Sequence, residues 1–181
     1  YNPTTLAPKG LLIEQSSTNL LTYSEQLNNA AWSPSFSTVN ANVVTAPDNT
    51  LTGDEIISTG SGGRVTQQIT INSTSCTFSV FLKVDGTDNG ARLLVYNTTT
   101  STNLGSNSPA LITSGTPYAN GWYRHSFTVT SGITSGNSIT FYLYTDNLGG
   151  TSGTKLYAWG AQVEAGISFP TSYIPTTSAT V

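Results

Sequence analysis

The 181-residue chain contains little charge: it has 6 Lys and Arg and 9 Asp and Glu, so charged residues make up 8% of it instead of the usual quarter. The net charge is −3, and the six basic residues are scattered along the chain: Lys9, Arg64, Lys83, Arg92, Arg124 and Lys155. Because nucleic-acid binding needs clustered basic side chains to neutralise phosphates, this composition argues against a nucleic-acid partner. No apolar run approaches the roughly 20 residues of a membrane helix, so we expect no membrane insertion.

Cysteine and histidine are each present once, as Cys76 and His125. A single cysteine excludes an internal disulfide and a cysteine metal site. Nucleophilic triads and most metal hydrolases use histidine. His125 falls between Tyr123 and Phe127 in the apolar phase of an alternating run, a position that favours a buried structural histidine over a catalytic base.

Hydrophobic residues make up 36% of the chain and aromatic residues 10%, on a background of Ser, Thr, Asn and Gly. Disordered chains combine high charge with few aromatics, so this composition indicates a folded chain. The length favours a single domain over residues 1–181, with irregular ends at about 1–10 and 166–181. The chain begins at Tyr1 without an initiator Met or a signal peptide, and we expect it to be part of a longer polypeptide.

Apolar and polar residues alternate with a period of two in several runs, which predicts half-buried strands. These runs cover residues 39–45, 65–71, 78–84, 93–96, 123–129 and 139–144. The short apolar runs 11–14 and 19–23 are further strand candidates, and 85–90 is expected to be a hairpin loop. Residues 24–32 are expected to form one helical turn with Ser24 as its N-cap. Many short strands without a sustained helical period predict an all-β antiparallel sandwich or barrel.

Residues 155–164 are apolar in both phases of the alternation. A strand that is apolar on both faces is normally covered on both sides, so this run is predicted to be a central strand. Pro170 and Pro175 then end the regular pairing and release an extended tail.

Three blocks of the sequence resemble modules that recur in bacteriophage tail and virion proteins. The blocks are 10–14 with 18–25 and Ala31-Trp32, 78–83 with 122–124, and 159–164 with 170–177. Those modules are similar to the carbohydrate-binding modules of families 4, 9 and 22, which are galactose-binding-like jelly rolls that often hold a structural calcium ion. The resemblance implies a jelly-roll sandwich, virion-associated or extracellular, that binds a glycan or forms a homo-oligomer within a phage assembly.

The same resemblance implies one structural Ca²⁺, with a departure in its expected site. The carbohydrate-binding modules commonly carry an aspartate pair in the last strand, where this chain has Trp159-Gly160. Glu25 and Glu164 are the remaining candidates to supply the oxygen ligands that calcium prefers. Asp85 and Asp88 also suit calcium, but turn formation explains them as well, so we assign no ligands.

Glycan recognition uses planar aromatic faces for the apolar sides of sugar rings, with amide, hydroxyl and charged groups around them. The polar phase of the predicted strands holds Phe81 and seven further aromatic or basic side chains that make up the candidate site: Tyr142, Tyr144, Tyr96, Arg92, Lys83, Trp122 and Arg124. We therefore predict that they point away from the main core and bind a polysaccharide or surface glycan. The alternative is that some of them pack under loops or belong to a second sheet.

The hypothesis from the sequence is a non-catalytic carbohydrate-binding module. A structural decoration domain of a phage tail or capsid, with aromatics in subunit contacts, is the alternative. A small glycan-cleaving enzyme is less favoured, because jelly-roll lyases carry a Gln-x-His motif where this chain has Tyr123-Arg124 before His125. Glycosidases need two spaced carboxylates, and Asp54-Glu55 or Asp85 with Asp88 are more simply solvated or turn-forming residues.

Overall fold

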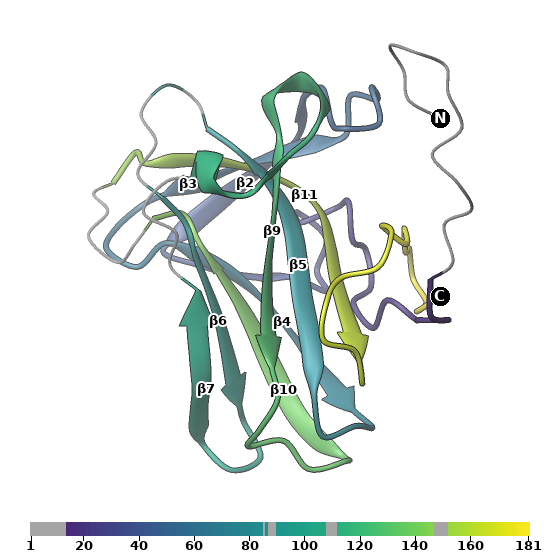
Figure 1. Cartoon of the computed structure of the whole chain (residues 1–181). Coiled ribbons are helices and arrows are strands. Elements are labelled where there is room, and N and C mark those ends of the chain that lie inside the picture. The colour runs from purple at the N-terminus through teal and green to yellow at the C-terminus, as the bar shows by residue number, and fades with distance from the viewer. Residues whose placement is uncertain (1–13, 85, 87–89, 108–111, 147–151) are drawn as a thin grey trace, which may run out of the picture.

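The computed structural model describes residues 14–84, 86, 90–107, 112–146 and 152–181 (Figure 1). Two antiparallel sheets lie face to face in a jelly-roll β-sandwich, which confirms the all-β prediction. Helical structure among these residues is limited to the 3₁₀ turns η1 (Ile112–Ser114) and η2 (Ala119–Gly121). In the part of the chain that is described, no helix has the length and apolar character needed to cross a membrane.

The five-stranded sheet has the order β1-β4-β10-β6-β7, and the six-stranded sheet has the order β2-β3-β11-β5-β9-β8. The five-stranded sheet consists of β1 (Ser33–Ser35), β4 (Arg64–Ile71), β10 (Asn137–Tyr144), β6 (Arg92–Asn97) and β7 (Thr102–Asn107). The six-stranded sheet consists of β2 (Ser37–Val44), β3 (Gly53–Ser58), β11 (Lys155–Ala165), β5 (Cys76–Lys83), β9 (Tyr123–Val129) and β8 (Thr116–Pro117).

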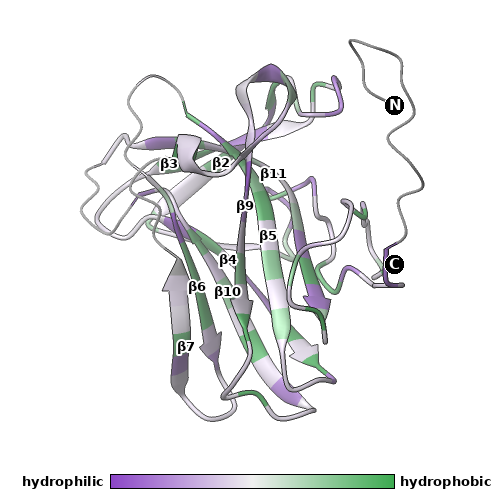
Figure 2. Cartoon of the chain, in the orientation of Figure 1, coloured by the Kyte–Doolittle hydropathy of each residue, from purple (hydrophilic) through white to green (hydrophobic). Residues whose placement is uncertain are grey.

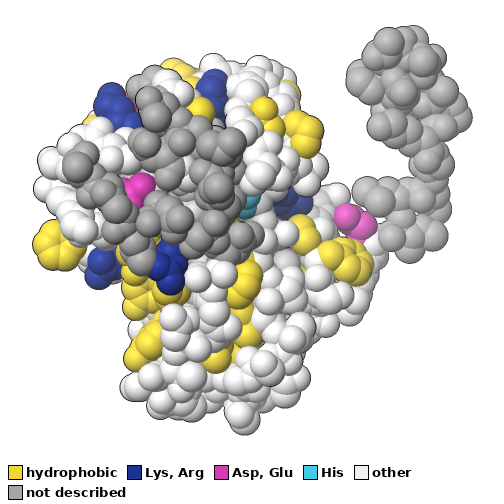
Figure 3. Space-filling model, turned by 60° about the vertical axis from the view of Figure 1, so that its left-hand side comes forward, with side chains coloured by type: hydrophobic (Ala, Val, Ile, Leu, Met, Phe, Trp, Pro, Cys, Tyr) yellow, Lys and Arg dark blue, Asp and Glu magenta, His cyan; other side chains and the backbone are white. Residues whose placement is uncertain are grey.

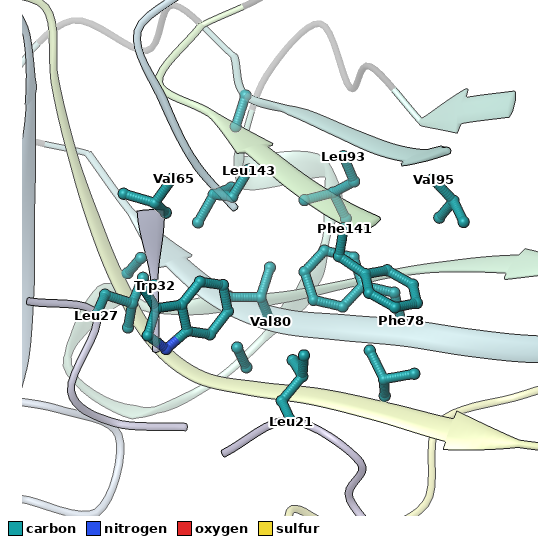
Figure 4. Close-up of a cluster of buried hydrophobic side chains, with 14 of the residues drawn as sticks. Leu21, Leu27, Trp32, Val65, Phe78, Val80, Leu93, Val95, Phe141 and Leu143 are labelled. Atoms are coloured by element: carbon teal, nitrogen blue, oxygen red, sulfur yellow. The ribbon is translucent and has the colours of Figure 1, made fainter. Parts of the chain in front are cut away.

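The core lies between the two sheets and is built from the apolar phase of the alternating strands. Figure 2 shows this alternation as bands of hydrophobic and less hydrophobic residues along β5. Phe78 of β5 and Phe141 of β10 meet across the sandwich with ring centroids 5.3 Å apart (Figure 4). Leu21, Leu27 and Trp32 from the segment before β1 also enter this cluster. Because successive side chains of a strand point to opposite faces, the polar phase is left on the outside of each sheet.

Strand β11 is an interior strand of the six-stranded sheet, between β3 and β5, as its two apolar phases predict. Leu156 and Ala158 face the main core, whereas Trp159 belongs to a second buried cluster on the outside of the sheet. The C-terminal segment 166–181 contains no strand and lies beside β11 (Figure 1). It is held by hydrogen bonds from the Ile174 amide to Gln162 Oε1 and from the Thr176 amide to Ser24 Oγ.

Some local predictions are wrong. Residues 19–23 form no strand, because their amides bond singly to different partners: Leu20 to Val163 O, Thr22 to Gln67 Oε1 and Tyr23 to Thr177 O. Residues 24–32 form successive turns and no helix, and Ser24 Oγ accepts the Thr176 amide instead of capping a helix. Residues 11–13 and most of the predicted 85–90 loop lie outside the described residues.

Candidate functional site

The outer surface of the five-stranded sheet brings together the tyrosines that the sequence predicts as ligand contacts. We call this surface the tyrosine face; it comprises Arg64, Thr66 and Gln68 of β4, Thr140, Tyr142 and Tyr144 of β10, and Arg92, Leu94 and Tyr96 of β6. In the strand register, Tyr144 lies between Arg64 and Arg92, and Tyr142 lies between Thr66 and Leu94. Directly paired residues of an antiparallel sheet have neighbouring side chains on the same face.

Tyr142 and Tyr144 stack on each other, with ring centroids 6.0 Å apart and an angle of 13° between the ring planes. Both side chains are half-buried, so part of each ring remains open to solvent. Two residues of separation along a strand place both rings on one side of the sheet. Figure 3 shows hydrophobic side chains gathered on one face of the molecule with Lys and Arg side chains beside them.

Arg64 supports the stacked pair, a role that was not predicted from the sequence. Its Cζ atom lies 5.9 Å from the ring centroid of Tyr142 and 5.6 Å from that of Tyr144. Its Nη1 donates a 3.0 Å hydrogen bond to the carbonyl oxygen of Gly62. The guanidinium is thus fixed between the loop before β4 and the two rings, an arrangement that cation–π attraction stabilises. The sequence feature that could have indicated this role is the position of Arg64, which falls in the same phase of the alternation as Thr66 and Gln68.

The phenol of Tyr142 stays protonated at neutral pH. Burial raises its pKa above the ordinary tyrosine value, and the nearby phenols of Tyr144 and Tyr96 add to the rise while Arg64 opposes it. A protonated phenol is both a hydrogen-bond donor and an acceptor. The tyrosine face therefore offers ring surfaces for apolar contact and hydroxyl groups for polar contact.

Lys83 of β5 and Arg124 of β9 lie in the other sheet, and Trp122 directly precedes β9, so none of the three joins the tyrosine face. Trp122 is completely buried beside Phe81 and Trp159, and its Nε1 donates a 2.8 Å hydrogen bond to Thr45 O. The prediction that Trp122 contacts a glycan is therefore wrong, because its ring lies under the segment after β2. The alternative, that some of these side chains pack under loops, is confirmed here.

Arg124 is also buried, so its predicted contact with a glycan is wrong for the same physical reason. Its Nη1 donates to Thr171 O and its Nη2 donates to Ser79 Oγ, at 2.7 and 2.9 Å. Its Cζ lies 5.2 Å from the Phe81 ring centroid. The guanidinium thus ties the C-terminal segment to β5. Lys83 is half-buried and lies opposite Tyr157 of β11, on the six-stranded sheet.

His125 is buried in β9, and its Nε2 lies 2.6 Å from Ile112 O, which supports the structural interpretation over a catalytic one. Asp54, buried in β3, accepts hydrogen bonds from the amides of Leu27 and Asn42, and burial raises its pKa. Asp85 and Asp88 lie outside the described residues.

Two of the carboxylates named for calcium, Glu25 and Glu164, accept hydrogen bonds from different protein groups. Glu164 is buried and accepts hydrogen bonds from the Thr171 amide and hydroxyl. Glu25 accepts a 3.1 Å hydrogen bond from the Tyr173 hydroxyl, and burial raises the pKa of Glu25. In the described ranges, no three His, Cys, Asp or Glu side chains are grouped to hold a metal ion. Protein N–H and O–H groups engage Glu25 and Glu164, and the structural calcium ion that the resemblance implies stays a prediction without assigned ligands.

Neither a protein-family model nor a curated protein sequence matches the chain. Solved structures do share its fold. The CBM22-1 xylan-binding domain of Xyn10C from Paenibacillus barcinonensis is similar with a TM-score of 0.55 and 9% identity, over 87% of this chain and 100% of that domain. The enzymatically active domain of tailspike protein 4 from bacteriophage CBA120 is similar with a TM-score of 0.53 and 10% identity, over 80% of this chain.

A third similar structure contains the CBM22-1 and GH10 modules of xylanase 10B from Clostridium thermocellum, with a TM-score of 0.50 and 11% identity over 87% of this chain. The chain spans 21% of the tailspike domain and 29% of the xylanase structure. The resemblance to jelly-roll carbohydrate-binding modules and phage modules that the sequence indicates is thus confirmed as a likeness of fold.

Proposed function

We propose that this chain is a non-catalytic carbohydrate-binding module and that its tyrosine face binds a polysaccharide. The observation that carries the proposal is the stacked, half-buried pair Tyr142 and Tyr144, held in place by the Arg64 guanidinium. Aromatic rings provide large apolar area at a small cost in side-chain entropy, and ligand sites combine such area with a few placed polar groups. The apolar faces of pyranose rings match the exposed part of the tyrosine rings.

Polar side chains surround the stacked rings and suit sugar hydroxyls. Gln68 is exposed, and its amide donates a 2.6 Å hydrogen bond to Ser138 Oγ, which orients the side chain. Tyr96 lies across from Thr140 in the register and is half-buried. Amide and hydroxyl groups both donate and accept hydrogen bonds, as a glycan hydroxyl requires.

The similar folds of a xylan-binding domain and of a phage tailspike domain support this function and its setting. In that setting the module is virion-associated or extracellular and attaches a larger phage polypeptide to a surface polysaccharide. A single open face buries little area, so one copy binds modestly, and repeated copies on one particle supply avidity.

The absence of suitable catalytic groups on the tyrosine face supports a non-catalytic role. The strands of the five-stranded sheet contain no Asp, Glu or His. Glycoside hydrolysis uses two carboxyl groups about 5–10 Å apart. Assaying reducing-end release from the bound polysaccharide tests this point, and sustained release by the purified chain would overturn the non-catalytic role.

A structural decoration domain is the second candidate, and two observations favour it: the tailspike likeness, and the exposure of large apolar side chains. Phe36, Leu51 and Phe169 are each at least 60% exposed. Such side chains on a virion protein suit contacts between subunits. Size-exclusion chromatography with light scattering separates the candidates, because a decoration domain forms a stable oligomer and the binding module stays monomeric.

Replacing Tyr142 or Tyr144 by Ala tests the proposed function. We expect each substitution to weaken retention in polysaccharide affinity electrophoresis by about tenfold, since central aromatic contacts carry much of a binding energy. The free energy of unfolding should fall by less than about 1 kcal/mol, because cross-strand pairs on an open face contribute only that much.

Tyr118→Ala is the matched control, because Tyr118 is 46% exposed and lies against Phe81, on the other sheet. This variant should retain binding. The proposal fails if Tyr142→Ala binds like the unaltered chain, or if Tyr118→Ala loses as much affinity as Tyr142→Ala.

A further inference from the structure

We infer that the polysaccharide bound by the tyrosine face is acidic and that its repeating unit carries a carboxylate, as uronic acids do. This inference rests on the proposed function and adds the chemical class of the ligand. It is carried by two arginines that flank the stacked tyrosines on a sheet whose strands contain no acidic side chain.

Charge is divided unequally between the two sheets. The strands of the five-stranded sheet contain Arg64 and Arg92 and no Asp or Glu, although the whole chain has a net charge of −3. The strands of the six-stranded sheet carry both signs: Asp54, Glu55 and Glu164 together with Lys83, Arg124 and Lys155. The tyrosine face is therefore a positively charged surface on an acidic molecule.

The two arginines stand on either side of one ring. Tyr144 pairs with Arg64 of β4 on one side and with Arg92 of β6 on the other. Paired Cβ atoms in a sheet lie about 5 Å apart, so both guanidinium groups can reach substituents on a sugar that stacks on Tyr144. Arg64 is held over the two rings and is thereby oriented before any ligand arrives.

Arg64 and Arg92 form no ion pair within the described part of the chain. The ion pair found there joins Lys155 to Glu55 on the other sheet, and neither arginine contacts a carboxylate of the described residues. Arg124 differs, because both its Nη atoms are used inside the protein. Arg64 and Arg92 are half-buried, so each keeps part of its side chain open to solvent.

A carboxylate is the group that fits such a pair. The guanidinium group presents a planar fork of donors that binds a carboxylate through two parallel hydrogen bonds, and charge-assisted hydrogen bonds are about twice as strong as neutral ones. A uronic acid carries its carboxylate at the edge of the pyranose ring. Stacking of that ring on Tyr144 directs the carboxylate toward the flanking guanidinium groups. A neutral polysaccharide would leave both charges without a partner.

The experiment uses an array of alginate, polygalacturonate and polysialic acid, each printed beside its carboxyl-reduced, neutral form, together with neutral and sulfated polysaccharides. We expect the chain to bind a carboxylated polysaccharide and to lose about tenfold or more of its affinity when the carboxyl groups are reduced. Raising NaCl from about 50 mM to about 500 mM should weaken binding several-fold, because salt screens exposed charges.

Substitutions at Arg92 locate the effect, because Arg92 does not support the stacked tyrosines. Arg92→Gln should weaken binding to the carboxylated polysaccharide by about tenfold, and Arg92→Lys should lose less, since it keeps the charge without the fork. Lys155→Gln is the matched control: it removes one positive charge from the opposite sheet and should leave affinity unchanged. Near-ultraviolet circular dichroism of each variant checks that the tyrosine stack is retained.

The outcomes separate this inference from the proposed function. If a neutral or only a sulfated polysaccharide binds and Tyr142→Ala abolishes that binding, the tyrosine face is a glycan site and the carboxylate inference is wrong. Equal binding of acidic and carboxyl-reduced forms overturns it as well. If no polysaccharide binds in a manner that depends on Tyr142, the proposed function fails and the inference falls with it.

Discussion

Three arginines stand in strands of this molecule, and their surroundings give them different functions. Arg64 and Arg92 lie on an open sheet face, whereas Arg124 is 8% exposed and bonds to Thr171 and Ser79. Aromatic residues divide in the same way: Tyr142 is half-buried, and Trp122 is enclosed completely. Residue type alone therefore does not separate the residues of the proposed glycan site from residues that pack inside the protein. What separates them is whether other segments of the chain cover the outer surface of the sheet.

Trp122→Ala should affect stability and leave glycan specificity unchanged. Removing a fully buried tryptophan costs about 3–5 kcal/mol of unfolding free energy, and the indole N–H bond to Thr45 is lost with it. Urea denaturation measures the loss. The fraction that stays folded should bind the same polysaccharide as the unaltered chain. A stable Trp122→Ala variant with altered binding would contradict the assignment of Trp122 to packing.

Strand β11 shows how one element can be covered on both faces. Its register against β5 shifts between Trp159 and Gln162, at a bulge where Gly160 has φ +62°. The bulge leaves room for Tyr173 of the C-terminal segment, whose ring centroid lies 4.6 Å from that of Trp159. This segment occupies the outside of the six-stranded sheet and leaves the tyrosine face as the open sheet surface.

Gly160→Ala should loosen this arrangement. An added Cβ would lie 3.0 Å from Phe81 Cδ2 and 3.2 Å from Tyr173 Cε2, and the positive φ is unfavourable for alanine. We expect the crowding and the backbone strain together to lower the free energy of unfolding by about 2–4 kcal/mol. Gly136→Ala is the control for backbone strain alone, since Gly136 has φ +89° and no atom within 4 Å of its Cβ position. Equal losses in both variants would show that crowding at Gly160 is unimportant.

The alternation of apolar residues predicts β4, β5, β6, β9 and β10 well, because each has one face on the core. It fails for β3, where Asp54 and Glu55 are buried in adjacent positions and hide the pattern. It also fails for 19–23, an apolar run in which the amides of Asn19, Leu20 and Tyr23 bond to carbonyl groups more than 140 residues away. Such partners depend on the folded chain, and local periodicity carries no information about them.

The candidate site could be predicted only in part, because it too depends on contacts between segments that are distant in the sequence. The alternation of apolar and polar residues shows that the side chains of Tyr96, Tyr142, Tyr144 and Trp122 point away from the main core. It does not show on which sheet each of them lies. The C-terminal segment and the residues after β2 cover the six-stranded sheet through contacts distant in sequence, such as Trp122 Nε1 to Thr45 O. The role of Arg64 could not be predicted, because it depends on the pairing of Arg64 with Tyr144 across neighbouring strands, and the sequence alone does not define that pairing.

At the scale of the whole molecule, the sandwich has two unlike outer surfaces. One is covered by the C-terminal segment and contains buried aromatics. The other is open, carries two arginines and three half-buried tyrosines, and has no acidic residue in its strands. A particle that displays many copies with the open face outward would gain avidity from modest single contacts.

Amide chemical-shift mapping by NMR, during titration with a fragment of the polysaccharide selected on the array, tests the central claim most directly. The account predicts that the largest shifts fall in β4, β6 and β10, with Arg64, Arg92, Tyr142 and Tyr144 among them. Shifts concentrated in β5, β9, β11 and residues 166–181, with the tyrosine face unperturbed, would contradict it.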